Sequence, residues 1–434
     1  MGEFTGSLIP LLHDHTLSLL TIPVLSGLTG YVINWTGVWM LYKPVRFKGF
    51  HVPGLLALAR RFPRKLRGVP GLREGGIGWQ GIIPSRARKL GTIAVENQIA
   101  KIGEPREFYE QLDPDELADH IVASSREDVR DLVGRIMARD HPELWRELPP
   151  RARELVYSRV DEEMPGVARE VTAGIGENID ELFDVKQMVI RLTYDNPELT
   201  NKLFHEVAAK EFRIIIRLGF VFGFLFALPA IPLVIAVPEW WVLPLAEAVI
   251  GYATNWAGIW MIYEPREPRK FGPFRLQGLF LRRQHDAAAA YGEVISEDVI
   301  TLSNMGEELL HGPRSDRTRA LIESALRPAV DRAAGAARPA VRVGMGAEEY
   351  EATRDAVAAG AVEKTLAPLQ DEELGHERGA QIRELFTERM REMSKADFSE
   401  TMRAATREDE WMLVAHGALF GVVGGLLHYV IFGV

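Results

Sequence analysis

Cysteine is absent from this chain of 434 residues. Its absence excludes disulfide bonds, thiolate metal sites and a cysteine nucleophile, and it leaves the redox compartment undecided. A surplus of positive charge is also absent, because 51 basic residues face 60 acidic ones and the formal net charge is -9. This balance argues against nucleic acid as a partner.

The motifs of common enzyme chemistry are absent too. The chain has no HExxH pair and no GxxxxGK loop followed by Ser or Thr for binding phosphate. Six histidines scattered through its polar regions lack the spacing of metal ligands; they are His120, His141, His205, His285, His311 and His376. We therefore predict that the protein is not an enzyme and uses no cofactor and no metal.

Long apolar runs are what the chain has instead. A helix needs about 20 apolar residues to cross the hydrocarbon core of a bilayer, and four windows reach that length. They run from about residues 17 to 42, 214 to 237, 241 to 263 and 411 to 434. The link Pro238-Glu239-Trp240 is so short that the second and third windows must form a helical hairpin. The alternative is that these are buried helices of a large soluble protein.

Basic residues collect on one side of the first three windows; they include Lys43, Arg46, Lys48, Lys210, Arg213, Arg217, Arg266, Arg269 and Lys270. Such residues accumulate in cytoplasmic loops. We therefore expect a multi-pass protein of the bacterial inner (plasma) membrane, with both termini outside and both long polar segments in the cytoplasm. The first residues, MGEFTGSLIP, contain an acid and no basic leader, so we expect no cleaved signal peptide. The chain is therefore predicted to divide into five segments. They are an N-terminal segment with the first transmembrane helix (1–43), a first cytoplasmic helical domain (44–212), a transmembrane hairpin (213–263), a second cytoplasmic helical domain (264–410) and the fourth transmembrane helix (411–434).

The densest basic stretch covers residues 59–73, ARRFPRKLRGVPGLR. Its basic side chains, Arg60, Arg61, Arg64, Lys65 and Arg67, are candidates for contact with an anionic lipid surface, where each contributes roughly 1 kcal/mol. The alternative is that they serve only as the positive-inside signal.

The chain repeats itself. Residues 30–44 read GYVINWTGVWMLYKP, and residues 251–265 read GYATNWAGIWMIYEP. A second repeated motif begins at Gln80-Gly81 and at Gln277-Gly278. In a third, Gly219 and Gly223 correspond to Gly417 and Gly421. Each half reads as a span, a loop, a helical segment and a span, so the halves are predicted to be parallel repeats related by an axis along the membrane normal.

These repeated lines resemble a known family. The line GYxxNW followed by MxYxP, the element GIIPSR downstream, and an amphipathic run entering a Gly-x-x-x-Gly span resemble the bacterial membrane proteins of domain-of-unknown-function family 445, the YheB- and YjiN-like proteins. Departures are Ile33, where the pattern prefers the threonine that Thr254 supplies, and Leu281, where the first half has Pro84. The resemblance implies an integral membrane protein and brings no catalytic residues.

Polar side chains inside the windows are the candidate site residues. Asn34 and Asn255 are predicted to hold the repeated spans against neighbouring helices, whose close approach Gly30, Gly37, Gly251 and Gly258 allow. The alternative is that the two amides line a polar pathway. Glu247 is the one acid well inside a window, and we hypothesise that it pairs with His428 at the interface of the halves. Alternatively, Glu247 reaches the outer headgroups.

Glycine faces are predicted to pack the second and fourth spans on each other or on another protomer, through Gly219, Gly223, Gly417, Gly421 and Gly425. Helices are predicted to start at Asp113-Pro114 and at Asn196-Pro197, where an N-cap side chain precedes a proline at the first helical position. We expect the second helix, and a similar lead-in from Asp397 to Trp411, to run unbroken into the membrane. Strands are expected near Ile82 and Leu279, and the stretch 71–78, GLREGGIG, as a flexible loop.

The fold class is therefore predicted as all-α, an integral membrane protein with four transmembrane helices and two cytoplasmic helical segments, built as a parallel internal duplication. The amphipathic helices of the cytoplasmic segments either pack into a bundle or line an apolar groove. The function expected is that of a non-catalytic membrane-anchored helical scaffold or interaction module. The alternative is transport or handling of a lipid or small solute at the interface of the repeats. Membrane lipids are the expected partners, with a second copy or another membrane protein as further candidates.

Overall fold

The computed structural model describes residues 16–99, 102–271, 274–335, 338–404 and 406–432. These residues form helices and two short β-hairpins, in agreement with the all-α prediction. They group into two compact units. We name residues 1–94, 193–291 and 388–434 the apolar unit, and residues 95–192 and 292–387 the polar unit. The two long polar segments of the sequence are therefore not two separate domains, because each contributes half of the polar unit.

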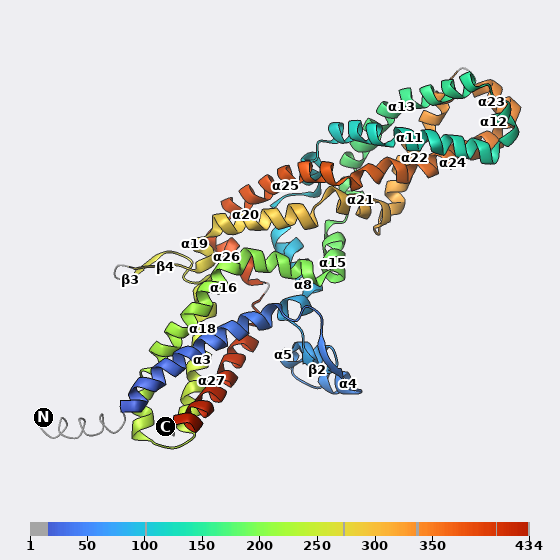
Figure 1. The fold of residues 1–434 in the computed structure, drawn as a ribbon. Coiled ribbons are helices and arrows are strands. Elements are labelled where there is room, and N and C mark those ends of the chain that lie inside the picture. Colours follow the sequence, from blue (N-terminus) through green and yellow to red (C-terminus); the bar gives the residue numbers. More distant parts are fainter. Residues whose placement is uncertain (1–15, 100–101, 272–273, 336–337, 405, 433–434) are drawn as a thin grey trace, which may run out of the picture. The chain divides into compact units, whose positions relative to one another are not determined.

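The apolar unit contains α3 (Thr16–Tyr42), β1 (Lys48–His51), α4 (Leu55–Ala59), α5 (Arg64–Arg67), α6 (Pro70–Arg73), β2 (Gly76–Trp79), α7 (Ile82–Ser85), α8 (Ala87–Ala94), α16 (Pro197–Ala227), α17 (Ala230–Ala236), α18 (Val242–Tyr263), β3 (Arg269–Phe271), β4 (Phe274–Leu276), α19 (Leu279–Arg282), α26 (Lys395–Ala404) and α27 (Glu410–Phe432). Its four long helices form a bundle, in which α3 packs chiefly on α16, and α18 chiefly on α27 (Figure 1). Contacts of α3 with α27 and of α16 with α18 close the ring.

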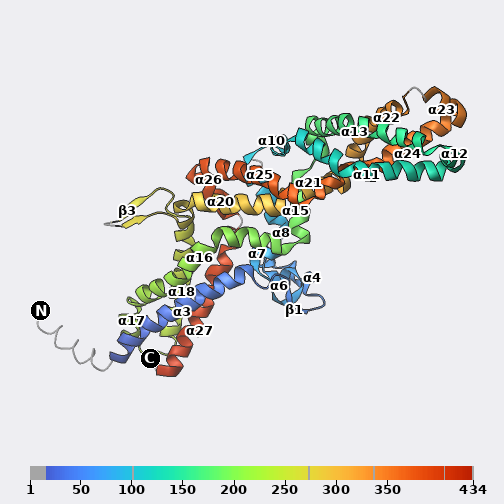
Figure 2. The same cartoon turned by 45° about the horizontal axis from the view of Figure 1, so that its top comes forward.

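The polar unit contains a π-helical turn (Val95–Ile99), α10 (Pro105–Glu110), α11 (Pro114–Asp140), α12 (Pro142–Glu147), α13 (Pro150–Glu177), α14 (Ile179–Leu182), a second π-helical turn (Ile295–Val299), α21 (Leu302–His311), α22 (Ser315–Ala334), α23 (Arg338–Met345), α24 (Ala347–Leu366) and a 3-10 turn (Ala367–Gln370). Here α11 and α13 from the first half pack with α22 and α24 from the second (Figure 2). The helices α15 (Val185–Asp195), α20 (Gln284–Val294) and α25 (Glu372–Glu392) contribute residues to both units.

Capping side chains explain where two of the long helices begin. Asp113 accepts a hydrogen bond from the Glu116 amide at 3.3 Å, and Pro114 follows at the first position of α11. Asn196 caps α16 in the same way, through the Leu199 amide at 3.3 Å. Both starts agree with the sequence prediction, and α16 runs unbroken from its cap into the apolar bundle.

Two predictions of local structure are wrong. The lead-in to the fourth window is broken, because α26 ends at Ala404 and α27 begins at Glu410. The stretch 71–78, expected as a flexible loop, is partly strand, because β1 pairs antiparallel with β2 from Lys48–Trp79 to His51–Gly76.

The sequence predicts strands near Ile82 and Leu279. β2 and β4 end just before these two residues, which themselves begin α7 and α19. The predicted second span is bent by 43° between α16 and α17, where the prolines of the sequence ALPAIP interrupt helical hydrogen bonding.

Candidate functional site

Two glycine crossings bring helix backbones into contact inside the apolar unit. A Cβ added to Gly30 of α3 would overlap the carbonyl oxygen of Gly219 on α16, and the reverse addition would overlap the Gly30 oxygen. Gly251 of α18 and Gly417 of α27 meet in the same way. Each half of the chain therefore contains one helix pair that only glycine allows to approach so closely.

The crossings continue one turn along each pair. A Cβ on Gly223 would overlap the Ser26 carbonyl, and one on Gly421 would overlap the Glu247 carbonyl. A Cβ on Gly425 would lie 2.6 Å from the Cα of Pro244. The prediction that α16 and α27 pack on each other through these glycines is wrong, because each glycine face meets the complementary face of the helix in its own half. The alternative, packing on another protomer, stays a prediction.

The two asparagines bond backbone carbonyls of the helices that they face. Asn34 donates its Nδ2 to the Ile215 carbonyl on α16 at 2.7 Å, and Asn255 donates to the Leu413 carbonyl on α27. They are only 4% and 7% exposed, which removes both amides from the outer surface of the bundle. Because these bonds sit beside the glycine crossings, the geometry agrees with the structural interpretation, in which each amide holds a repeated helix to its neighbour.

Glu247 and His428 have different partners. The carboxyl of Glu247 accepts a hydrogen bond from the Ser26 hydroxyl, and Nε2 of His428 lies 3.3 Å from the Thr21 hydroxyl. The hypothesised Glu247–His428 pair is therefore not formed. Glu247 is 2% exposed, so its carboxyl does not reach the surface of the bundle either. Since Ser26 and Glu247 occupy equivalent positions of the two repeats, their bond joins the halves.

Two ion pairs also join the halves, and the sequence interpretation missed both. Arg86 donates to Asp409 at 2.9 and 3.2 Å, and Arg283 donates to Glu211 at 2.8 Å. The acids are nearly covered, with side-chain exposures of 6% and 2%. Each half supplies one arginine and one acid, so the pairs obey the symmetry of the repeat. The signal was present, because Glu211 and Asp409 stand at the same spacing before Gly219 and Gly417.

A small cavity lies where the four long helices meet. Its volume is about 60 Å³, and its lining includes Asn34, Asn255, Phe212, Tyr263 and Glu410. A space of roughly 10–15 Å³ is enough to hold one water molecule. The cavity therefore has room for a few water molecules, in a place to which both halves contribute.

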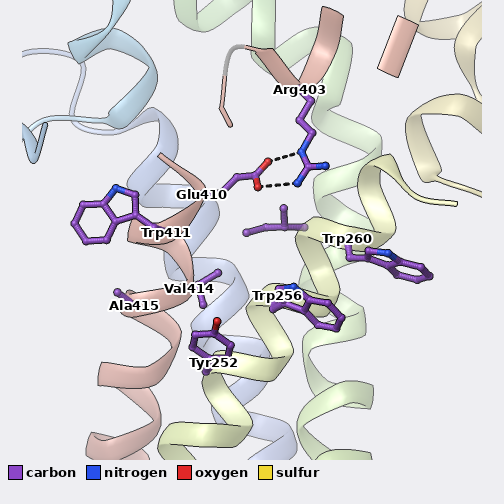
Figure 3. Close-up of a pocket in the computed structure, with 9 residues that line it drawn as sticks. Tyr252, Trp256, Trp260, Arg403, Glu410, Trp411, Val414 and Ala415 are labelled. Atoms are coloured by element: carbon purple, nitrogen blue, oxygen red, sulfur yellow. Dashed lines mark hydrogen bonds and ion pairs between the residues drawn. The ribbon is translucent and has the colours of Figure 1, made fainter. Parts of the chain in front are cut away.

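A larger groove lies on the outside of the second helix pair. It has a volume of about 330 Å³ and is open on one side; its lining residues are Tyr252, Trp256, Ile259, Trp260, Arg403, Glu410, Trp411, Val414 and Ala415. Figure 3 shows aromatic side chains of α18 along the groove and an ion pair at one end of it. The sequence interpretation did not find this groove.

The ion pair of the groove has a bidentate geometry. Arg403 donates from Nε and Nη2 to the two carboxylate oxygens of Glu410, at 2.8 and 2.9 Å. These bonds raise the pKa of the Arg403 guanidinium, which therefore stays charged. The first half has no equivalent pair, since His205 and Phe212 stand at the corresponding positions and pack against the Tyr42 ring.

The insertion of the first half forms a small lobe with basic and apolar side chains on its surface. Arg60, Arg61, Lys65 and Arg67 are exposed, while the side chain of Arg64 lies outside the described residues. Large apolar side chains beside them in the sequence are exposed as well: Phe50, Leu56, Leu58, Leu66 and Ile77. We call residues 48–79 the basic lobe. Its composition is typical of segments that lie at a lipid surface.

Measured by length and hydropathy, α27 is a helix that can cross a membrane, and the bent pair of α16 and α17 passes the same test as a unit. In the described residues no other helix passes it. Only 22% of the apolar window of α27 is buried, whereas a core helix of a soluble protein is mostly buried. The described residues contain no group of three or more His, Cys, Asp or Glu side chains placed to hold a metal ion.

Comparisons with protein-family models, with curated proteins and with solved structures found no match. The resemblance to family 445 thus stays an expectation from the sequence.

Proposed function

We propose that the protein is a non-catalytic inner-membrane protein whose apolar unit crosses the bilayer with four helices and whose polar unit is a helical interaction module in the cytoplasm. The observation that carries this proposal is the inverted polarity of the apolar unit, which has large apolar side chains outside and polar side chains inside.

The outer surface of the bundle is apolar along all four long helices. Exposed large side chains include Leu20, Leu28 and Trp35 on α3, Phe220 and Leu225 on α16, Leu245, Val249 and Trp256 on α18, and Leu419, Leu427 and Val430 on α27. A soluble monomer rarely exposes a continuous apolar patch of more than a few hundred Å². The acyl chains of a bilayer would cover this surface and keep its apolar side chains away from water.

The interior of the same bundle contains polar side chains. Ser26, Asn34, Glu247, Asn255 and His428 are each less than 9% exposed. The apolar core clusters lie toward the two ends, one containing Ile22 and Leu243 and the other Leu41 and Met412. Polar groups inside a membrane bundle face other helices because lipid offers them no hydrogen bonds, which is the arrangement found here.

Aromatic and basic residues suit this placement. Trp240 and Trp241 are exposed at the turn before α18, where the outer aromatic belt would lie. Trp39 and Trp260 lie near the C-terminal ends of α3 and α18, and Trp411 lies at the N-terminal end of α27. The basic lobe follows the C-terminal end of α3 in the sequence. The basic lobe would then rest on the anionic cytoplasmic leaflet. Membership of family 445 would imply the same placement.

The second candidate is handling of a small solute at the interface of the repeats. The cavity between Asn34 and Asn255 favours it, because both halves line that cavity. Its volume of about 60 Å³ suits a few water molecules or a small ion. We rank it second because both amides already bond backbone carbonyls.

Alkaline carbonate extraction combined with fluorescence quenching tests the main proposal. The protein should stay in the membrane pellet, and lipids brominated on their acyl chains should quench its tryptophans, because Trp35 and Trp256 are 54% and 56% exposed on the outer face of the bundle. A protein that is released by carbonate and stays dispersed without detergent would contradict the proposal.

A further inference from the structure

The internal repeat allows the groove of the second half to be compared with its counterpart. Tyr31, Trp35 and Trp39 of α3 match Tyr252, Trp256 and Trp260 of α18 in spacing. All six are at least 40% exposed, so both helices present the same aromatic stripe to their surroundings. What differs is the neighbouring helix, which contributes an ion pair only in the second half.

We propose that this groove binds one zwitterionic phospholipid, with its phosphate at Arg403 and its ammonium at Glu410 and the indole rings. The inference rests on the proposed placement of the apolar unit in a membrane. It goes beyond that placement by assigning a headgroup class to one site on the bundle.

The charges of the groove match those of a zwitterion. Arg403 uses Nε and Nη2 for Glu410, which leaves Nη1 and its two N–H groups without a partner among the described residues. The carboxylate of Glu410 is 18% exposed and has lone pairs beyond the two that Arg403 occupies. Because the pair is neutral as a whole, an anionic headgroup gains little net attraction. A phosphate and an ammonium on one molecule can each meet an opposite charge.

The aromatic walls select the ammonium part of the headgroup. Trp260 and Trp411 line the groove near the ion pair, and a cation over an indole face gains about 0.5–2 kcal/mol. A free amine would also meet these groups, but it would leave the rest of the groove empty. Tyr252 lies about 12 Å along α18 from Trp260, at 1.5 Å per residue, and Val414 and Ala415 continue the lining there.

The polarity of the groove follows the expected depth in the bilayer. Arg403 and Glu410 lie where α26 gives way to α27, which is the predicted cytoplasmic end of the fourth span. The deeper part, at Tyr252 and Ala415, is walled by aromatic and aliphatic groups (Figure 3). A phospholipid in the inner leaflet would have its headgroup and its acyl chain at these two levels.

Native mass spectrometry of the full-length protein in a mild detergent tests the inference. Phosphatidylethanolamine and phosphatidylglycerol with identical acyl chains are titrated separately, and the apparent affinity for the first bound lipid is measured. We expect the first lipid to bind about tenfold more tightly as phosphatidylethanolamine, the size of effect that one cation–π contact in a desolvated site gives. Equal affinities, or a preference for phosphatidylglycerol, would overturn the inference.

The first half supplies the matched controls. Trp260→Ala should weaken binding of phosphatidylethanolamine about fivefold, whereas Trp39→Ala at the equivalent position should leave it unchanged. Glu410→Gln should abolish the headgroup preference, because Arg403 is then an uncompensated cation. Trp260→Phe keeps an aromatic ring and should retain most of the binding, which guards against a folding defect in the alanine variant. Equal effects of Trp260→Ala and Trp39→Ala would refute a specific groove.

Failure of the inference is distinguishable from failure of the proposed membrane placement. A protein that resists carbonate extraction but binds both lipids equally lacks the site and keeps the placement. A protein that stays soluble without detergent loses the placement, and the inference fails with it.

Discussion

The glycine crossing of Gly30 with Gly219 offers the sharpest test of the packing. Gly30→Ala places a methyl group in overlap with the Gly219 oxygen and 3.1 Å from the Gly219 carbonyl carbon. Because backbone atoms cannot rotate away, α3 and α16 must separate until the Gly219 oxygen has moved about 1.2–1.7 Å away from the added methyl group, to an ordinary contact distance of about 3.5–4.0 Å. Overpacking of this kind costs about 1–3 kcal/mol.

Separation of the helices also stretches the bond from Asn34 to the Ile215 carbonyl, now 2.7 Å. Interhelical hydrogen bonds in membranes contribute about 0.6 kcal/mol on average and about 1.7 at most. We therefore expect Gly30→Ala to lower the free energy of unfolding by about 2–4 kcal/mol.

Gly37 on the same helix is the matched control. A Cβ at Gly37 has its nearest neighbour, the Cδ2 of Leu413, at 4.0 Å, which is an ordinary contact. Alanine is favoured over glycine in a helix by up to about 1 kcal/mol, so Gly37→Ala should be neutral or stabilising. Both variants are compared with the original protein by unfolding in mixed micelles with increasing sodium dodecyl sulfate. Equal destabilisation by the two substitutions would refute the reasoning.

Three further predictions follow from buried charges and from the basic lobe. Arg283→Met should lower the free energy of unfolding by about 3–5 kcal/mol because Glu211 is left buried without its ion pair, and Glu211→Leu in the same chain should restore much of it, as a double-mutant cycle would show. Burial raises the pKa of Glu308, which is 2% exposed although Arg191 lies 2.7 Å away. An acid with a raised pKa contributes stability that is lost as the pH increases, so Glu308→Gln should raise the melting temperature more at pH 8 than at pH 4; an equal shift at both would count against this. Neutralising the exposed basic side chains of the lobe should weaken binding to anionic vesicles and reduce its dependence on salt, as sedimentation with vesicles would measure; unchanged binding would leave these side chains only as an orientation signal.

The sequence predicted what depends on local pattern. The helix starts at Asp113 and Asn196 were recognisable because a cap and a proline act within a single turn. The break after Ala404 was not recognisable, since Thr406 to Asp409 contain no proline or glycine, yet they form turns closed by local backbone hydrogen bonds such as the one from the Asp409 amide to the Thr406 carbonyl.

Pairings between distant residues were the harder part of the site. The repeat identified Gly30, Gly219 and Asn34 as candidates for contacts between helices. It could not show that each glycine face packs against a helix of its own half. Glu247 was recognisable as a buried acid inside an apolar window. Its hydrogen bond with Ser26 could not be recognised, because a single serine inside an apolar window gives no sign of which side chain it will bond. Assembly of the polar unit from both halves likewise depends on tertiary contacts alone.

Site-directed labelling tests the central claim, that four helices cross the membrane and leave both polar segments on one side. The chain has no cysteine, so single cysteines introduced at the exposed positions Arg126, Glu239 and Glu348 are the sole targets for a membrane-impermeant maleimide. We predict that Glu239→Cys is labelled in intact cells, and that Arg126→Cys and Glu348→Cys are labelled only after permeabilisation. Labelling of the last two from opposite sides of the membrane would contradict the account.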